Sequence, residues 1–215
     1  MSAWIRKRPL LAYGLLAYGF TWTIASPQLL ASRGLISAPD LHWLEPLAAF
    51  GPFVAGMLIA RALDGRDGPR RILRSLVHWR VGWGPAVLAV LSPVVLLVMA
   101  IAGVAATAGL EIDAERPQLL RLSTTAGLFQ LILVGALIQA WGEEPGWRGF
   151  MLPRLRAARG PLMASLILFP VWLLWHLPFF LSRPEFGLPQ WLGFSAGILS
   201  AAIWLTLVWD ATGSV

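Results

Sequence analysis

Residues 84–108 are GPAVLAVLSPVVLLVMAIAGVAATA, a stretch without a charged side chain. A helix needs about 20 largely apolar residues to cross a bilayer, because in lipid its backbone polar groups must be satisfied within the segment. This stretch is long enough, so it predicts a membrane-spanning helix. Similar apolar stretches occur at 10–31, 41–63, 123–144, 161–182 and 188–209. The sequence therefore predicts an all-α, polytopic transmembrane helical bundle with about six spans.

The composition excludes a soluble protein. Hydrophobic residues make up 57% of the 215 residues and charged residues 13%, with a mean hydropathy of +0.68. A soluble domain has about a quarter of its residues charged. We therefore expect residues 1–215 to form a single membrane domain. The absence of cysteine excludes disulfides, a thiol nucleophile and thiolate metal sites.

The basic residues predict the topology. The formal net charge is +6, and most Lys and Arg residues fall in three blocks that precede span 1, separate spans 2 and 3, and separate spans 4 and 5. All three blocks would then lie on one side, which the positive-inside rule makes cytoplasmic. We expect a cytoplasmic N-terminus in a bacterial-type plasma membrane, with the lipid bilayer as a partner and no nucleic acid. The blocks are Arg6, Lys7 and Arg8; Arg61, Arg66, Arg70, Arg71, Arg74 and Arg80; and Arg148, Arg154, Arg156 and Arg159.

The loop after the second span begins with a turn rich in glycine, at 63–69. Ile72, Leu73 and Leu76 then recur at helical spacing opposite arginines. This pattern favours a short helix lying in the membrane interface. A solvated loop is the alternative.

The segment QAWGEEPGWRGF at 139–150 contains two adjacent carboxylates after a long apolar run. Ionisable groups at that depth are costly and usually have a partner inside the bundle. Glu144 and Arg148 are four residues apart with the acid first, the favourable order for an ion pair on one helix face. Pro145 predicts a kink beside them. The alternative is that the helix ends here, with its charges at the surface.

His176 lies in the apolar run VWLLWHLPFF at 171–180. Glu144 precedes, and His176 follows, the Gly160-Pro161 turn by the same number of residues. An antiparallel helical hairpin about this turn would place the carboxylates and the imidazole at one height in the bundle. Carboxylate and imidazole together can activate a water. A lone histidine that only packs and hydrogen-bonds is the alternative.

The segment Gly193-Phe194-Ser195-Ala196-Gly197 matches G-x-S-x-G, but the hydrolase motif needs a strand-turn-helix elbow. This copy lies inside a predicted span, where small residues four apart favour close helix packing.

Three motifs together resemble the CPBP family of intramembrane proteases. This family includes the type II CAAX prenyl endopeptidases and bacterial proteins linked to bacteriocin processing or self-immunity. The resemblance covers residues 45–215 and is looser upstream of the first motif. The motifs are Glu143-Glu144-x-x-x-Arg148, then Gly149-Phe150 with Pro153-Arg154-Leu155, then Trp175-His176-Leu177-Pro178.

The resemblance implies an intramembrane endopeptidase acting on prenylated CAAX-type or other membrane-associated peptides. Glu143 would be the water-activating base, Glu144 with Arg148 the supporting pair, and His176 the group that orients water or stabilises the oxyanion. Two chemistries stay open: a glutamate-activated water alone, or a divalent metal such as zinc bound by Glu143 and His176. A catalytic zinc site usually has three protein ligands.

Two departures from the family pattern stand out. Trp172 occupies a position where the family usually has Phe, an aromatic exchange that we expect to be tolerated. The family has a further motif, a His with Asn or Asp four residues later, which follows a Thr-Gly-Ser turn, whereas this sequence stops at Val215. Without that motif we expect little or no hydrolysis by these 215 residues. A catalytically inactive membrane protein on the same scaffold, with an immunity or binding role, and a small transporter with a Glu-Arg-His relay are the alternatives.

Overall fold

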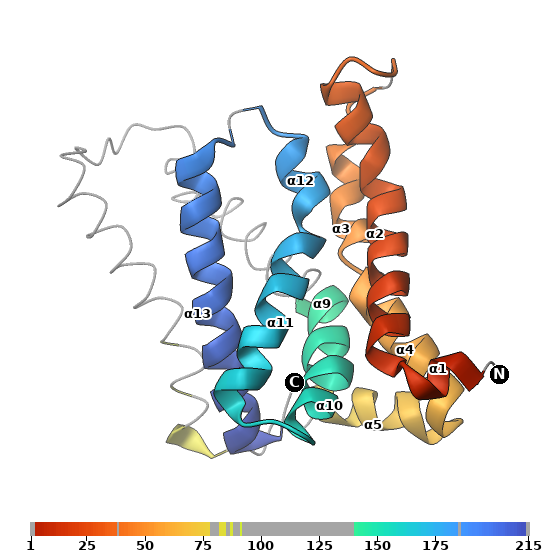
Figure 1. The fold of residues 1–215 in the computed structure, drawn as a ribbon, viewed down its shortest axis with the longest axis vertical. Helices are drawn as coiled ribbons and strands as arrows, with labels where there is room; N and C mark the ends of the chain where they lie inside the picture. Colours follow the sequence, from red (N-terminus) through yellow and green to blue (C-terminus); the bar gives the residue numbers. More distant parts are fainter. Residues whose placement is uncertain are drawn as a thin grey trace, which may run out of the picture. The chain divides into compact units, whose positions relative to one another are not determined.

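A computed structural model describes residues 3–77 except 38, residues 140–213 except 185, and a few positions between 82 and 91. The chain forms two compact units, Met1–Trp79 with Ile138–Val215 and Arg80–Leu137. The helices described below all belong to the first unit (Figure 1). Every regular element in the described ranges is helical, which confirms the all-α fold. The span predicted at 84–108 and most of the one at 123–144 lie outside the described residues.

The described helices coincide with four predicted spans, at 10–31, 41–63, 161–182 and 188–209. Two of them, Glu45–Asp64 and Leu188–Thr212, are long and apolar enough to cross a membrane. The count of about six spans stays a prediction. The elements are α1 (Ala3–Lys7), α2 (Pro9–Ser32), η1 (His42–Leu44), α3 (Glu45–Ala48), α4 (Gly51–Asp64), α5 (Asp67–Leu76), α9 (Ala140–Gly146), η3 (Trp147–Met151), α10 (Leu152–Arg156), α11 (Pro161–Trp175), α12 (Leu177–Leu181) and α13 (Leu188–Thr212).

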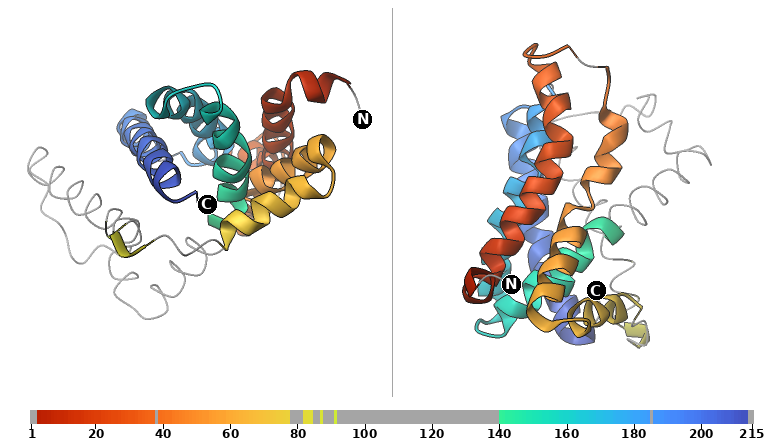
Figure 2. Two further views of the ribbon diagram at one scale, coloured as in Figure 1. Left: turned by 90° about the horizontal axis from the view of Figure 1, so that it is seen from below. Right: turned by 90° about the vertical axis from the view of Figure 1, so that its right-hand side faces the viewer.

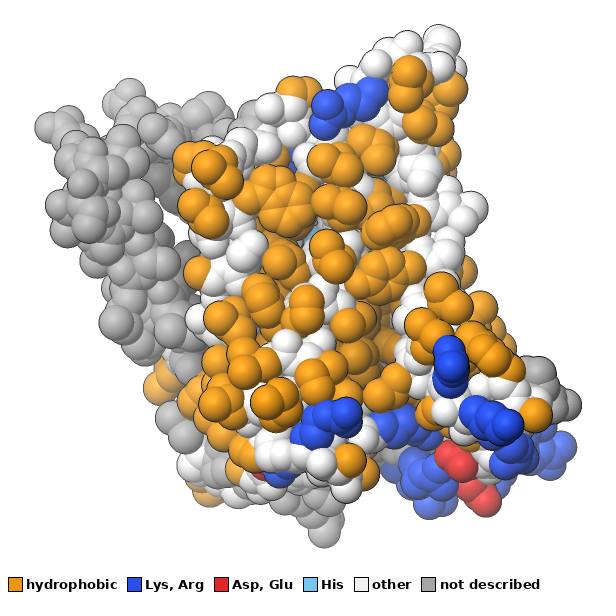
Figure 3. Space-filling view, in the orientation of Figure 1, with side chains coloured by type: hydrophobic (Ala, Val, Ile, Leu, Met, Phe, Trp, Pro, Cys, Tyr) orange, Lys and Arg blue, Asp and Glu red, His pale blue; other side chains and the backbone are white. Residues whose placement is uncertain are grey.

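The basic segments gather at one end of the first unit, as the charge pattern predicts. Helices α1, α5 and α10 all lie at the lower end in Figure 1, and Figure 3 shows Lys and Arg side chains there, below a broad apolar face. Arg148 is an exception, because only 2% of it is exposed and it lies inside the unit. Helix α5 confirms the predicted short amphipathic helix, with Ile72 buried and Arg71 exposed.

Helix α2 packs along α4, and Figures 1 and 2 show the two side by side. Gly51, the first residue of α4, permits this contact, since a Cβ atom there would lie 2.7 Å from the carbonyl oxygen of Ala17. Thr21 donates a hydrogen bond to the carbonyl of Ala48 at 2.7 Å and accepts one from Trp175 Nε1 at 2.9 Å. Thr21 therefore connects α2 to both α3 and α11.

Two glycines bring α9 against α4. A Cβ atom on Gly146 would lie 2.3 Å from the carbonyl oxygen of Pro52, and one on Gly142 would lie 2.7 Å from that of Ala49. These glycines are four residues apart, the spacing that lets two membrane helices approach backbone to backbone. With the glycine face against α4, the side chains of Glu143 and Glu144 project away from this contact.

The small residues of the motif at Gly193 and Gly197 meet no neighbouring helix among the described residues, so the packing expected there stays a prediction. Around Gly193 and Gly197, an added Cβ atom would meet no atom within 4 Å. The motif does lie within α13, so it forms no hydrolase elbow.

Helix α9 is not ended by Pro145, and it is followed directly by a wider, π-helical turn. Pro145 lies inside α9, and the following turn, Trp147–Met151, is a π-helix. Such single wide turns interrupt α-helices and are frequent at functional sites. The kink predicted at Pro145 is therefore a local widening, and the helix then runs through α10 to Arg156.

The span predicted at 161–182 is divided at His176. Helix α11 ends at Trp175, and α12 begins at Leu177 with Pro178 at its second position. A proline ring clashes with the carbonyl of the residue four positions earlier and lacks an N–H, so it interrupts the helix. The N–H of His176 consequently bonds to the carbonyl of Leu173 at 3.1 Å, three residues back.

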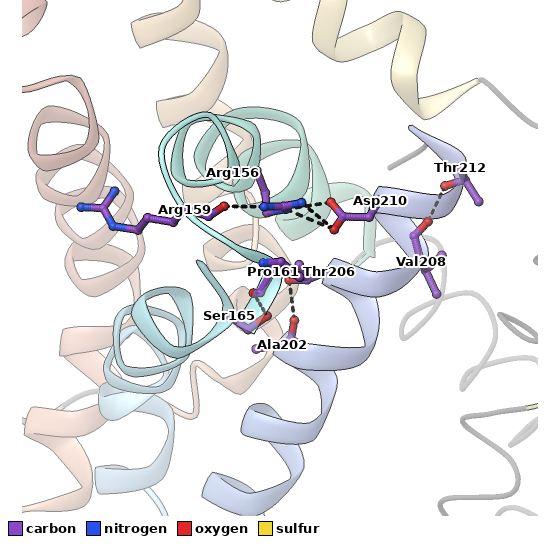
Figure 4. Close-up of polar contacts among 9 residues, drawn as sticks. All are labelled: Arg156, Arg159, Pro161, Ser165, Ala202, Thr206, Val208, Asp210 and Thr212. Carbon is purple, nitrogen blue, oxygen red and sulfur yellow. Dashed lines mark hydrogen bonds and ion pairs between the residues drawn. The ribbon is translucent and has the colours of Figure 1, made fainter. Parts of the chain in front are cut away.

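An ion pair connects the tip of the hairpin to α13 (Figure 4). Arg156 donates from Nε to Asp210 Oδ1 and from Nη2 to Asp210 Oδ2, both at 2.8 Å, and from Nη1 to the carbonyl of Arg159. The sequence shows Asp210 only as an isolated acid. In the fold it links α13 to the turn that joins α10 and α11.

Candidate active site

Glu144 and Arg148 form the predicted ion pair. Arg148 Nη1 lies 2.8 Å from Glu144 Oε1. The guanidinium is almost completely buried, and 23% of the Glu144 side chain is exposed. This geometry confirms the pairing expected from their spacing, and Glu144 is the neutralised member of the two carboxylates.

Glu143 has a different partner. Its Oε2 accepts a hydrogen bond from Trp172 Nε1 at 2.9 Å, across the hairpin from α9 to α11. No ion pair of Glu143 occurs among the described residues. The two neighbouring carboxylates therefore lie in different environments, one paired with a cation and the other held by a neutral N–H.

Trp172 contacts both halves of the carboxylate motif. Its N–H bonds to Glu143, and the guanidinium carbon of Arg148 lies 4.1 Å from the centre of its ring. A cation over an indole face is attracted by the ring quadrupole. We expected Trp172 to be a simple aromatic replacement for Phe. A Phe could provide the ring for Arg148 but no hydrogen bond to Glu143.

The backbone fixes the proton of His176. Its Nδ1 lies 2.8 Å from the carbonyl oxygen of Trp172. A carbonyl oxygen only accepts, so Nδ1 carries the hydrogen and donates it. In the neutral ring Nε2 is then the acceptor. The carbonyl of Trp172 is available because the helix break leaves it without its usual N–H partner four residues later.

Aromatic rings hold the orientation of His176. Its ring centre lies 4.7 Å from that of Trp175, 5.0 Å from that of Phe194 and 6.0 Å from that of Phe180. Phe194 comes from α13, so three helices surround the imidazole. A ring confined in this way keeps Nε2 in one direction.

Several buried donors near the carboxylates have no acceptor among the described residues. They are the hydroxyl of Tyr13 and Nε and Nη2 of Arg148, together with Nε1 of Trp147, which lies near Glu143 without a well-formed hydrogen bond to it. The rings of Tyr13 and Trp147 are in contact, with centres 5.5 Å apart. Tyr13 also lies within electrostatic range of Glu143 and Arg148. A buried donor without a partner costs about 1–3 kcal/mol, so these atoms favour an oxygen atom bound beside them.

The described residues alone do not make a zinc site. No group of three or more His, Cys, Asp or Glu side chains converges within the described ranges. Glu143 and His176 are the residues that could bind a divalent ion here, and two ligands are fewer than a catalytic zinc site usually has. Metal dependence stays a prediction.

Two of the residues predicted from the sequence, Glu143 and His176, are both hydrogen-bonded to Trp172. Glu143 bonds to the side chain of Trp172, and His176 bonds to its carbonyl one turn later. Both residues therefore contact Trp172, whereas the equal height of the carboxylates and the imidazole, expected from their spacing about the Gly160 turn, stays a prediction. Tyr13 and Trp147 are site residues that the sequence did not predict, because a contact between α2 and η3 has no signal in local spacing.

Comparison with known proteins agrees with the motif. No curated protein and no solved structure matches the chain. Residues 125–215 match the model of the family described as "Type II CAAX prenyl endopeptidase Rce1-like". The match includes Glu143, Glu144, Arg148 and His176, whereas Tyr13 and the upstream part of the expected resemblance, 45–124, lie outside it. Over residues 125–215, the resemblance to the type II CAAX prenyl endopeptidases is thus confirmed.

Proposed function

We propose that this protein is an intramembrane endopeptidase in which Glu143 activates the hydrolytic water. The family match suggests a CAAX-type intramembrane protease. The identity of the base, the roles of the other residues and the substrate are our proposal. The observation that carries it is the division of the two carboxylates, with Glu144 paired to Arg148 and Glu143 bonded, among the described residues, to the neutral N–H of Trp172.

This division suits acid–base chemistry. A carboxylate that is already paired with a guanidinium is a poor proton acceptor, because protonation would break the ion pair. Glu143 carries no such pair in the described residues, so it can accept a proton without that loss. Paired acids with different environments commonly have different roles in hydrolases.

The proposed reaction is hydrolysis of one peptide bond. Water donates one hydrogen bond to Glu143 and the other to Nε2 of His176, and its oxygen attacks the carbonyl carbon while Glu143 takes the proton. The tetrahedral intermediate then breaks its C–N bond, and Glu143 passes the proton to the leaving amine. Buried donors beside the carboxylates, including Arg148 Nε and the hydroxyl of Tyr13, are the groups available to the developing oxyanion.

The proposed substrate is a prenylated CAAX-type peptide held at the membrane surface. The test uses the full chain in detergent with two quenched-fluorescent peptides, one farnesylated and one with a free thiol, and identifies products by mass spectrometry. Cleavage of the farnesylated peptide at one bond supports the proposal, and it would also show that the family motif whose absence predicts little or no hydrolysis is dispensable. Cleavage of both peptides alike would contradict the substrate, and cleavage of neither would favour a non-catalytic protein on this scaffold.

A further inference from the structure

An apolar groove of about 820 Å³ runs between α2 and the α10–α11 hairpin. Figure 3 shows this face, where hydrophobic side chains cover both helices. The residues that line the groove include no charged side chain among those described. The groove lies along the apolar body of the unit and ends near its basic end, so it presents hydrocarbon-compatible surface at membrane depth.

Two glycines of α2 make room for the groove. Gly14 and Gly19 line it, and an added Cβ atom at either position would meet nothing within 4 Å. Glycine in the interior of a helix disfavours the helix relative to alanine. Here the missing side chains leave space beside α11, where few residues of the two helices touch.

The polar atoms of the groove are already satisfied within the protein. The hydroxyl of Tyr18 donates to the carbonyl of Val171, and Trp22 Nε1 donates to the carbonyl of Trp175 at 3.1 Å. Thr23 and Ser26 donate to carbonyls of their own helix. The groove therefore offers a ligand apolar contact and few hydrogen bonds, which suits a hydrocarbon chain and disfavours an extended peptide.

Basic side chains flank the lower end of the groove. Arg6, Lys7 and Arg8 are exposed and immediately precede the lining residues at the start of α2. On the other side, Arg159 is exposed and follows the lining residue Leu155. None of these four cations forms an ion pair among the described residues. Figure 3 shows Lys and Arg side chains on both sides of this end.

We propose that the groove binds one anionic phospholipid, with an acyl chain between α2 and α11 and its phosphate among Arg6, Lys7, Arg8 and Arg159. From Leu10 to Ser26 the helix rises about 24 Å, which accommodates one acyl chain. Basic residues at the cytoplasmic ends of spans attract anionic headgroups. This site is independent of the proposed peptidase activity.

The first test counts bound lipids by native mass spectrometry of the full chain. The protein is purified in detergent and given phosphatidylglycerol or phosphatidylcholine with identical acyl chains. We expect at least tenfold greater retention of phosphatidylglycerol. Equal retention of the two lipids, or displacement of the bound phosphatidylglycerol by millimolar inorganic phosphate, would overturn the proposal.

The second test fills the groove with leucine side chains and compares lipid retention with that of a control variant changed elsewhere. The double variant Gly14→Leu with Gly19→Leu should reduce retention about tenfold. Gly193→Leu with Gly197→Leu introduces the same side chains at positions of α13 that no described residue approaches and that do not line the groove, and should leave retention unchanged. Undiminished retention by the groove variant would overturn the proposal.

A third measurement uses the wild-type protein, so its result does not depend on whether a variant folds. Phosphatidylglycerol with a diazirine on its acyl chain is photolysed with the wild-type chain, and the labelled peptides are mapped. Labels should concentrate at residues 10–26 and 151–171. Labels confined to other segments, as expected if another part of the chain fills the groove, would rule the site out.

Discussion

Trp172 donates its indole N–H to Glu143 at 2.9 Å while its ring supports the guanidinium of Arg148 at 4.1 Å. One side chain of α11 thus contacts the Glu143 carboxylate and the cation that pairs with Glu144. The backbone carbonyl of the same residue fixes the proton of His176. The relative positions of base, supporting pair and imidazole therefore depend on where α11 places this residue.

Replacing Trp172 by Phe removes the N–H donor and keeps an aromatic ring for Arg148. A hydrogen bond to a charged group contributes about 1.5–3 kcal/mol, so Trp172→Phe should lower kcat/KM about 10–100-fold. Trp22→Phe is the control, because it removes an indole bond to the carbonyl of Trp175 without touching Glu143. Equal activity of Trp172→Phe and wild type would show that the bond to Glu143 has no part in catalysis.

Arg148→Ala should destabilise the protein more than removal of an exposed arginine. Breaking a buried ion pair from one side costs about 3–5 kcal/mol, and the partial exposure of Glu144 favours the lower value. The control is Arg70→Ala, since the side chain of Arg70 is 62% exposed and its ion pair with the exposed Asp67, at 3.7 Å, is of the solvated kind that contributes little. Arg156 is unsuitable because it pairs with Asp210. Equal melting temperatures in detergent would mean that Glu144 is solvated and the pair contributes nothing.

Gly146→Ala tests the contact that orients the carboxylates. The added Cβ atom would lie 2.3 Å from the carbonyl oxygen of Pro52, and such overpacking costs about 1–3 kcal/mol. Gly193→Ala adds the same methyl group in open space and should be neutral or stabilising by about 0.5–1 kcal/mol. Thermal unfolding in detergent compares the two. A Gly146→Ala protein as stable as Gly193→Ala would contradict the close approach of α9 and α4.

The orientation in the membrane can be tested with single cysteines, because the chain has none of its own. Arg66→Cys, Ala158→Cys and Pro184→Cys each introduce one thiol at an exposed position. With the N-terminus cytoplasmic, a membrane-impermeant maleimide added to intact cells should label only Pro184→Cys. Labelling at position 66 or 158 before lysis would reverse the topology.

The sequence predicts the local parts of the site well. The pairing of Glu144 with Arg148 follows from one helix face, and the helical hairpin follows from the Gly160-Pro161 turn and two apolar runs. The family resemblance through the same motifs is confirmed over residues 125–215. All of these depend on residues close together in the chain or on a motif spacing.

Contacts between distant segments could not be predicted in this way. Small residues four apart occur at Gly142 and Gly146 and again at Gly193 and Gly197, and spacing alone does not show which pair faces a neighbouring backbone. We expected packing at the second pair, and among the described residues it is the first pair that contacts a neighbouring backbone. The position of Tyr13 beside Trp147 likewise depends on how α2 lies against the hairpin.

The most direct test of the central claim is the activity of Glu143→Gln. Glutamine keeps the shape of the side chain and can still accept the bond from Trp172, but it cannot take a proton from water. The wild-type chain, Glu143→Gln and Glu144→Gln are purified in detergent, matched for melting temperature, and assayed on the farnesylated quenched peptide. We predict that Glu143→Gln abolishes whatever cleavage the wild-type chain shows, a loss of at least about 10²–10⁴-fold for a general base. Wild-type activity that survives in Glu143→Gln would show that Glu143 is not the base.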